Sequence, residues 1–257
     1  MLLKKIDIFF LFFYILYFIK TMELTNKIQN NKKISGLNSC FDTNPDIFEI
    51  GVDEVGRGPL FGRVYTAAVI LPKDDTFEHF NMKDSKRFHS KKKIQEVAEY
   101  IKANAIAWSV TYEDEQTIDS INILQATQQS MHKSISKIIE NNYNKSIDKV
   151  KKSYKLLIDG NYFKPFKPIE HYISTIDHIC IEGGDNKYTA IAAASILAKV
   201  ARDQYIEELC DLNPELDLHY GIRSNKGYGA KKHIDGIKEH GITIWHRRSF
   251  GICKSFV

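Results

Sequence analysis

The feature that most constrains this chain is the stretch at residues 50–59, where an apolar run ends in two adjacent acids and then breaks on a glycine–arginine–glycine–proline turn. The flanking apolar residues predict a strand over 47–53 that enters a core. Asp53 and Glu54 then lie at the edge of a buried region, where a bare carboxylate costs several kcal/mol unless it is paired or bound to a metal. The stretch is compatible with a phosphate-and-metal site, or with a solvated acidic turn that caps a strand.

The pattern after residue 59 predicts one mixed sheet with helices between its strands. An apolar face and a Ser90 N-cap favour a helix to residue 104, and a longer helical tract is expected to break near residues 120–122. Strands are expected at 64–71, 106–112, 155–160 and 171–181, and helices at 91–104, 114–142, 188–209 and 230–240. A basic, glycine-containing loop is expected at 223–229. Such an order of elements, with hairpin-like early strands, favours an α+β or a mixed α/β fold in one main domain.

The first 46 residues are expected to lie outside that domain. Twelve apolar residues between the lysines of segment 1–22 are too few for a membrane span, and no small-residue cleavage site follows them. We expect a dispensable leader ahead of an alternative start at Met22, in preference to a membrane anchor and then to a cleaved signal. Residues 23–46, rich in Asn, Lys and Ser, predict a flexible lead-in.

Composition adds two weaker constraints. The net charge of +4 is slight evidence for a polyanionic partner, because the placement of charge matters more than its sum. The four cysteines are scattered without metal-ligand spacing, which argues against a zinc site and a disulfide framework and favours a reducing, cytoplasmic setting.

Acids follow three of the predicted strands, each close to a glycine. Asp53 and Glu54 end the first strand, Asp159 ends the strand at 155–160, and Asp185 follows a pair of glycines. Carboxylates gathered at one edge of a sheet cannot all ionise without a cation, and oxygen ligands select Mg²⁺ or Mn²⁺. Two such ions are the usual device for phosphodiester hydrolysis. Any single acid among them could instead be a loop cap.

Several ordered motifs make the chain resemble the ribonuclease HII (type 2 ribonuclease H) family over residues 48–250. The resemblance begins with Gly51-Val52-Asp53-Glu54-Val55-Gly56-Arg57-Gly58-Pro59-Leu60. It continues with Asp84-Ser85-Lys86, Asn122-Ile123-Leu124-Gln125-Ala126-Thr127, Ile158-Asp159-Gly160, Gly184-Asp185, the alanine-rich segment 192–203, Asn225-Lys226-Gly227-Tyr228-Gly229 and His246-Arg247-Arg248-Ser249-Phe250. Val55 and Ala230 depart from the family pattern, which has a smaller alanine and a threonine there.

The resemblance implies a ribonuclease H-like fold, a mixed sheet flanked by helices, with a catalytic domain at 47–210 and a small helical substrate-binding region at 211–257. It implies cleavage of RNA in RNA–DNA hybrids and nicking 5′ to ribonucleotides embedded in duplex DNA. A monomer with no membrane partner is expected. The alternatives are a related nuclease that acts on DNA, and a hybrid-binding module without catalysis.

Site residues carry over position by position. The four metal-binding, catalytic carboxylates are Asp53, Glu54, Asp159 and Asp185. The motif that reads the ribose 2′-hydroxyl at the RNA–DNA junction is Gly56, Arg57 and Gly58, and Tyr228 matches the aromatic residue that packs on the sugar there. Candidate polar contacts are Lys86 with a phosphate near the scissile bond, and Asn122, Gln125 and Ser195 with the DNA strand.

Other basic residues are assigned less specifically. Lys226, Lys231, Lys232, Arg247 and Arg248 are candidates for contacts that follow the duplex backbone. The lysines at 91–93 are interpreted as a solvated helix face, Lys199 and Arg202 as internal partners of Asp203, and His233 and His240 as ordinary histidines. Because neighbours on a regular strand point to opposite faces, the first strand is expected to distort at Asp53 and Glu54.

Overall fold

A five-stranded mixed sheet organises the computed structural model, which describes residues 36–145, 153–167 and 176–257. Its strand order is β3-β2-β1-β4-β5. The strands are β1 (Ile47–Val55), β2 (Val64–Ile70), β3 (Ala107–Glu113), β4 (Ser153–Asp159) and β5 (Asp177–Ile181). β1, β2 and β3 pair antiparallel, whereas β4 and β5 run parallel to β1. β1 is therefore the central strand, and its carboxyl end lies beside those of β4 and β5.

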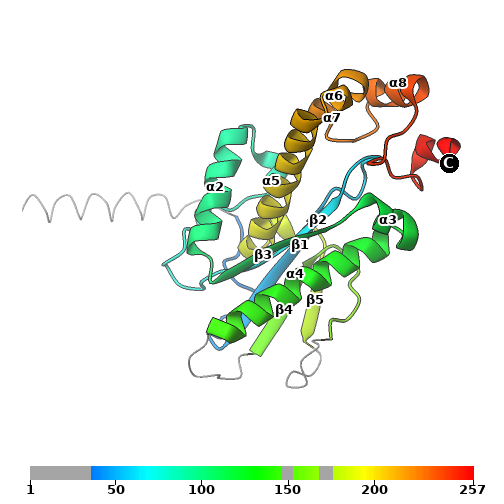
Figure 1. Ribbon diagram of the computed structural model, residues 1–257. Coiled ribbons are helices and arrows are strands. Elements are labelled where there is room, and N and C mark those ends of the chain that lie inside the picture. The colour runs from blue at the N-terminus through cyan, green and yellow to red at the C-terminus, as the bar shows by residue number, and fades with distance from the viewer. Residues whose placement is uncertain (1–35, 146–152, 168–175) are drawn as a thin grey trace, which may run out of the picture. The chain divides into compact units, whose positions relative to one another are not determined.

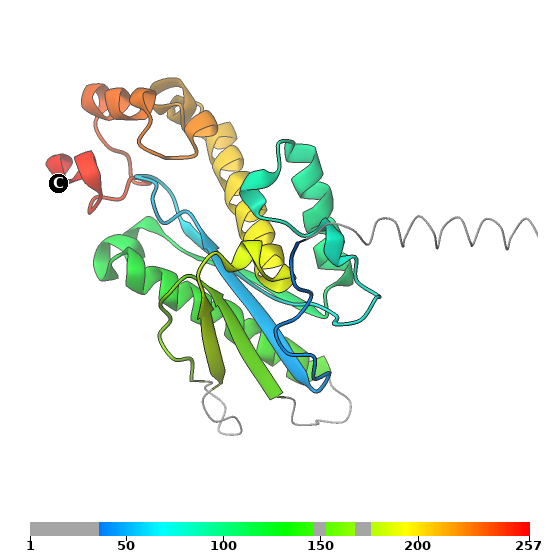
Figure 2. The same cartoon turned by 180° about the vertical axis from the view of Figure 1, so that it is seen from behind.

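Helices cover both faces of this sheet. The α-helices are α2 (Lys91–Asn104), α3 (Glu115–Ile121), α4 (Ile123–Lys145), α5 (Thr189–Leu212), α6 (Glu215–Tyr220), α7 (Ile222–Asn225) and α8 (Lys231–His240). Short 3-10 helices are η1 (His79–Asn81), η2 (Ser85–Arg87), η3 (Gly184–Asn186) and η4 (Gly251–Phe256). Figure 1 shows α4 crossing one face, and Figure 2 shows α5 and α2 on the opposite face.

The approach of α5 to β1 depends on small residues. A Cβ atom at Gly51 would lie 2.2 Å from the backbone carbonyl carbon of Ala190, a separation that no real Cβ tolerates. Ala192, Ala193 and Ala194 continue the close contact and are fully buried with β2 and α2. The alanine-rich sequence of α5 therefore lets a helix lie almost on the backbone of the central strand.

The opposite face is filled by larger side chains. Met131, Ile135 and Ile138 of α4 pack on Ile50 and Val52 of β1 in one buried cluster. Their helical spacing in α4 and the alternation along β1 produce two complementary apolar surfaces. This packing anchors the strand that carries the two adjacent acids.

The C-terminal helices pack against the end of α5 and the loop after β1. Phe61 of that loop is fully buried with Ile206, Ile237 and Cys253. The segment from Leu37 to Val257 forms one compact unit. The loop after β1 is thus enclosed by residues far along the chain, which matters for the site described below.

Most predicted elements are confirmed within a few residues. Ser90 caps α2, since its side chain accepts a hydrogen bond from the N–H of Lys93 at 3.3 Å. Asn122 separates α3 from α4 at a positive φ of 68°. The predicted loop at 223–229 is partly wrong, because α7 extends to Asn225. Of the strand predicted at 171–181, the part before residue 176 lies outside the described residues.

The predicted distortion of β1 is wrong. Its antiparallel register with β2 runs unbroken from Gly51↔Val69 to Val55↔Tyr65. The parallel pairing with β4 stops at Val52↔Ile158, so the last residues of β1 border open space on that side. Both acids can face this space from a regular strand end because the site adjoins the edge of the strand, beyond its pairing with β4.

The described residues contain no helix long and apolar enough to cross a membrane. The leader at 1–22 and the lead-in up to residue 35 lie outside those residues.

Candidate active site

A cleft of about 360 Å³ opens where the carboxyl ends of β1 and β4 meet η3 and α5. Its walls come from six separate segments of the chain. They are Asp53, Glu54, Val55, Gly56, Arg57, Gly58, Ser85, Lys86, Asp159, Asp185, Ser195, Lys199, Arg202, Asn225, Lys226 and Tyr228. Ten of the twelve predicted site residues therefore line one cleft, and Asn122 and Gln125 do not.

All four predicted carboxylates lie in this cleft. Asp53 and Glu54 end β1, Asp159 ends β4, and Asp185 lies in η3 beyond β5. Asp53 and Asp185 are nearly enclosed, with 4% and 6% of their surface exposed. Adjacent ends of β1 and β4 and the turn after β5 thus bring together acids more than a hundred residues apart.

Hydrogen bonds within the chain hold one oxygen of each carboxylate. Oδ1 of Asp53 accepts from the N–H of Glu54, and Oδ1 of Asp159 accepts from the N–H of Gly184, both at 2.6 Å. Arg57 donates to Oε1 of Glu54 at 3.2 Å. The side-chain amide of Asn186 donates to Oδ1 of Asp185 at 3.0 Å. Since a carboxylate has two oxygens and about four lone-pair sites, each acid keeps acceptor capacity for another ligand.

Burial and like charge oppose ionisation of Asp53, Glu54 and Asp185. Burial, with the charges of Glu54 and Asp159, raises the pKa of Asp53 well above its usual range. Burial also raises the pKa of Glu54, although Arg57 offsets part of the effect. The pKa of Asp185 is raised by burial and by Asp84 and Asp159, with Lys86 acting in the opposite direction. A cation in the cleft would relieve this crowding of negative charge.

The donor set of the cleft fits Mg²⁺ or Mn²⁺. All four candidate ligands are carboxylates, the oxygen donors that these ions prefer. In residues 36–145, 153–167 and 176–257, no three His, Cys, Asp or Glu side chains are already drawn together as a metal cage. The cleft is thus a recess lined by acids of the right chemistry for such an ion.

The loop after β1 forms the wall opposite the acids. Gly56 is buried with φ of +95°, and a Cβ there would lie 2.3 Å from Nε of Arg202, so only glycine fits. Gly58 and Arg57 are exposed to the cleft. A Cβ at Gly58 would lie 3.4 Å from Cε1 of Tyr228. The loop and the tyrosine ring, 50% exposed, therefore face a shared space.

Two buried arginines, Arg247 and Arg202, hold that loop through its backbone carbonyls. Arg247 donates to the carbonyl oxygens of Gly56 (2.6 Å), Arg57 (3.0 Å), Pro59 (2.9 Å) and Gly62 (2.8 Å). The expectation that Arg247 contacts the duplex is wrong, because its side chain is fully buried in these bonds.

Arg202 completes the support of the loop from α5. Its guanidinium donates to the carbonyls of Phe61 (3.3 Å), Arg63 (3.3 Å) and Lys226 (2.9 Å). Lys199 pairs with Asp203 as predicted, but Arg202 bonds backbone carbonyls instead of that acid. Arg202 thereby joins the loop after β1 to the loop that carries Tyr228.

Ser195 and Lys86 lie on the acidic side of the cleft. Ser195 is buried in α5, bonds Ser85 Oγ at 2.9 Å, and lowers the pKa of Asp53 in part through a hydrogen bond. This position fits support of the carboxylate better than contact with a DNA strand. Lys86 is exposed in η2, and its N–H donates to Asp84 at 2.8 Å. Its charge lowers the pKa of Asp185 in part, and its side chain lines the cleft beside the acids.

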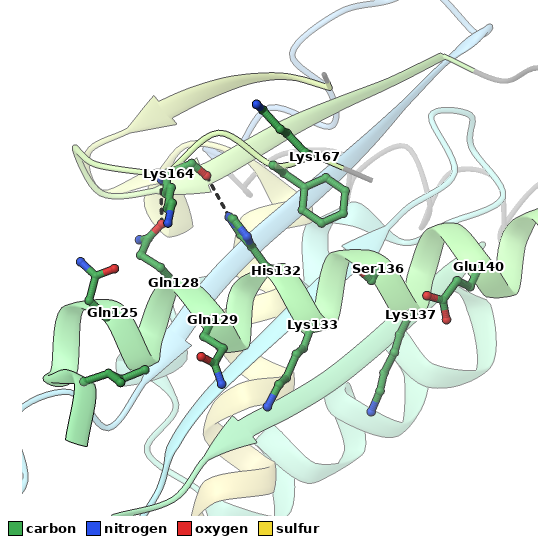
Figure 3. A pocket seen from close by; sticks show the side chains of 12 residues that line it. Gln125, Gln128, Gln129, His132, Lys133, Ser136, Lys137, Glu140, Lys164 and Lys167 are labelled. Carbon is green, nitrogen blue, oxygen red and sulfur yellow. Dashed lines mark hydrogen bonds between the residues drawn. The ribbon is translucent and has the colours of Figure 1, made fainter. Parts of the chain in front are cut away.

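Asn122 and Gln125 lie at the start of α4, outside the cleft. Oδ1 of Asn122 caps α4 by accepting from the N–H of Gln125 at 3.1 Å. Gln125 is exposed and lines a separate shallow groove along α4, where His132 and Gln128 bond the backbone of Lys164 (Figure 3). Any nucleic acid that contacts both places must extend beyond the cleft.

Sequence reasoning missed several groups that shape the cleft. Asp84 faces Asp185, and the amide of Asn186 contacts both, at 3.4 Å and 3.0 Å. Ser85 bonds Ser195, and Asn225 lines the cleft. Asp84 and Ser85 belong to the Asp84-Ser85-Lys86 motif, in which the sequence assigns a role to Lys86 only. The remaining contacts depend on tertiary packing and leave no local pattern.

The ribonuclease HII family profile matches residues 50–253, a range that includes every cleft residue above. The chain belongs to the ribonuclease HII family. Ribonuclease HII of Phocaeicola vulgatus is 41% identical over 211 residues, covering 81% of this chain and 92% of that protein. The ribonuclease H2 of Pyrococcus horikoshii OT3 matches with a TM-score of 0.56 at 21% identity, over 81% of this chain and 96% of that one. Bst-RNase HIII, solved in complex with Mn²⁺, has a TM-score of 0.58 at 21% identity, over 89% and 79% of the two chains.

The match to these solved structures confirms the ribonuclease H-like fold. One departure from the ribonuclease HII pattern has a visible structural effect. Ala230 precedes α8 as its N-cap and makes no side-chain hydrogen bond, where a threonine hydroxyl would accept one. The loop that carries Tyr228 consequently depends on other contacts for its position.

Proposed function

We propose that this chain is a metal-dependent endoribonuclease that cleaves the RNA strand of RNA–DNA hybrids and nicks 5′ to ribonucleotides embedded in duplex DNA. The observation that carries the proposal is the cleft itself, where four carboxylates face the Gly56–Gly58 loop and Tyr228. Membership of the ribonuclease HII family supports the same reaction. The two halves of the cleft correspond to chemistry and substrate choice.

On the chemical side, Asp53, Glu54, Asp159 and Asp185 would hold divalent ions, for which we propose Mg²⁺ or Mn²⁺. The raised pKa values of Asp53, Glu54 and Asp185, and a donor set made only of oxygens, favour an ion of this class. When bound, two such ions supply an activated water and stabilise the leaving oxygen. Lys86 lies where it can neutralise a phosphate near the scissile bond. Ser195 keeps Asp53 oriented through a hydrogen bond.

On the substrate side, the loop at 56–58 offers backbone groups to a ribose 2′-hydroxyl, which DNA lacks. Gly58 brings this backbone to within side-chain contact of Tyr228, so a sugar placed between them meets both. Exposed Arg57 and Lys231 are available for phosphate contacts that position the duplex. Asn122 and Gln125 would contact the DNA strand farther along the duplex.

The test compares three end-labelled duplexes with Mg²⁺ or Mn²⁺: one with a single ribonucleotide, one RNA–DNA hybrid, and one all-DNA. Cleavage of the first two, at the 5′ side of the ribonucleotide in the first, is expected. Asp53→Asn and Asp159→Asn should abolish cleavage, while Asp211→Asn, at an exposed position on the far end of α5, should retain it. Equal cleavage of the all-DNA duplex would support a DNA nuclease instead, and binding without cleavage would support a hybrid-binding module.

A further inference from the structure

Two buried histidines form a short hydrogen-bonded chain behind Tyr228. Nε2 of His233 lies 3.1 Å from Nε2 of His246. Nδ1 of His233 lies 2.8 Å from the carbonyl oxygen of Tyr228. At the other end, Nδ1 of His246 accepts from the backbone N–H of Thr243 at 2.9 Å. The two imidazoles therefore connect the backbone of Thr243 to that of Tyr228.

The backbone groups at the two ends of this row of hydrogen bonds determine where each imidazole proton lies. Nδ1 of His246 faces both the N–H and the hydroxyl of Thr243, each at 2.9 Å. The N–H can only donate and the hydroxyl can donate as well, so Nδ1 is the acceptor and a neutral ring carries its proton on Nε2. That Nε2–H donates to Nε2 of His233, whose own proton is then on Nδ1. This Nδ1–H donates to the Tyr228 carbonyl, which can only accept. All four ring nitrogens are satisfied when both rings are neutral and have opposite tautomers.

The surroundings favour these neutral rings. His233 and His246 are 0% and 1% exposed. Phe61 and Tyr220 pack edge-on against the ring of His246, each with centroids 5.1 Å away. Burial, then the neighbouring His233, lowers the pKa of His246 to about 3, and burial lowers the pKa of His233. A proton on either ring would also place two donors against each other.

The residue after His246 holds the 56–58 loop, which faces Tyr228 on the substrate side of the cleft. Arg247, next to His246, holds the carbonyls of Gly56 and Arg57. The backbone N–H of Leu60 also donates to the carbonyl of Gly227 at 2.8 Å. Two consecutive residues, His246 and Arg247, therefore act with Arg202 and the Leu60–Gly227 bond to position the 56–58 loop relative to Tyr228.

We propose that His233 and His246 are positioning residues, which act as a neutral imidazole relay to hold Tyr228 against the 56–58 loop and thereby set the preference for an RNA–DNA junction. The relay contacts the backbone of Tyr228 and does not touch the substrate. The inference rests on the proposed function, in which Tyr228 packs on the junction sugar.

The decisive test is a double-mutant cycle on single-ribonucleotide cleavage. His233→Leu keeps the side-chain size but removes the donor, and should lower kcat/KM by roughly tenfold or more, mostly through kcat, because small misplacements are costly. His233→Asn, whose amide can replace Nδ1 as donor, should recover part of the loss. In a Tyr228→Ala background, His233→Leu should cause little further loss. A full additional tenfold loss there would overturn the proposal.

The controls separate this proposal from the function on which it rests. His240→Gln alters an exposed histidine of the same helix, stacked on His219 at 4.0 Å between ring centroids, and should cleave like the parent. A parent chain that cuts no ribonucleotide-containing duplex refutes the proposed function. A cutting parent with an impaired Tyr228→Ala variant but an unimpaired His233→Leu variant refutes the relay alone.

A spectroscopic readout covers the case in which the leucine variant fails to fold. Nitrogen-15 spectra of the parent at pH 7 should show two neutral imidazoles, protonated on Nδ1 in His233 and on Nε2 in His246. The assignment of each ring follows from His233→Asn and His246→Gln. Finding an imidazolium at either position, or the same tautomer at both, would overturn the proposal.

Discussion

Replacing Arg247 tests whether the loop after β1 is held from within the protein or by substrate. Four hydrogen bonds join its guanidinium to the carbonyls of Gly56, Arg57, Pro59 and Gly62. At about 1.5 kcal/mol each for a charged donor, they contribute about 6 kcal/mol. Burial, together with the nearby charge of Arg202, lowers the pKa of Arg247 from 12.5 to about 9, which corresponds to a cost of about 5 kcal/mol for the charged form. The buried cation is therefore close to neutral in net stability while it is fully bonded.

Breaking the bonds removes the compensation and leaves carbonyls unpaired. Arg247→Lys keeps the charge but cannot reach four acceptors, so the free energy of unfolding should fall by about 2–4 kcal/mol. Arg247→Met, which removes the charge, should lower the free energy of unfolding by a similar amount. Urea unfolding at pH 7 measures both. If the free energy of unfolding of either variant lay within about 0.5 kcal/mol of the parent value, as for an ordinary surface substitution, the reasoning would be refuted.

The same variants separate support of the loop from contact with a phosphate. If Arg247 touched the duplex, its replacement would reduce the slope of log binding affinity against log salt by about 0.9. We expect that slope to stay unchanged in Arg247→Met, which lacks the charge, measured on a catalytically inactive Asp53→Asn background. Arg248→Gln is the matched comparison, because Arg248 is exposed and is the neighbouring candidate for a phosphate contact.

Three further outcomes follow from packing and charge. Gly51→Ala should destabilise the fold by about 3 kcal/mol or more in urea unfolding, because its Cβ would meet the backbone of Ala190 at 2.2 Å; the same change at Gly36, which has no neighbour within 4 Å, is the control. Asp53→Asn should raise the metal-free stability measured with EDTA, since burial raises the pKa of Asp53, and should reduce the stabilisation that Mg²⁺ gives the parent; an unchanged response to Mg²⁺ would contradict its role as a ligand. Burial lowers the pKa of His246 to about 3, so below about pH 6.5 the unfolded chain binds a proton that the folded chain does not. The free energy of unfolding of the parent should therefore fall by up to about 1.4 kcal/mol per pH unit towards pH 3, and less steeply in His246→Gln. Equal slopes in the two proteins would show that His246 is not buried as a neutral ring.

Local patterns carried much of the fold and the chemical half of the cleft. The strand at β1 and the acids at its end are adjacent in sequence, so an apolar run followed by Asp53 and Glu54 was enough to predict them. The N-cap at Ser90 and the break at Asn122 likewise depend on residues within one turn. Convergence of Asp159 and Asp185 on the same place followed from parallel strands that end at one edge.

Contacts between distant segments could not be inferred in the same way. Arg247 lies beside Arg248 in a basic stretch of the kind that contacts phosphates. Its nearest acceptor, however, is the carbonyl oxygen of Gly56, 191 residues earlier. Nothing local marks that partner. The distortion expected in β1 failed for a related reason, because the alternation of side chains describes a paired strand, and the point where β4 leaves β1 is set by tertiary structure.

The hydrogen bonds from residues 243–247 to the loop after β1 also bear on which parts of the cleft come first along the chain. A growing chain that has reached residue 240 already contains all four carboxylates and Tyr228. It still lacks the guanidinium that binds the carbonyls of residues 56–62 and the imidazole that completes the contact with Thr243. The four acids therefore precede, along the chain, the residues that hold the loop after β1, and that loop gains its full set of hydrogen bonds only when residues 243–247 are present.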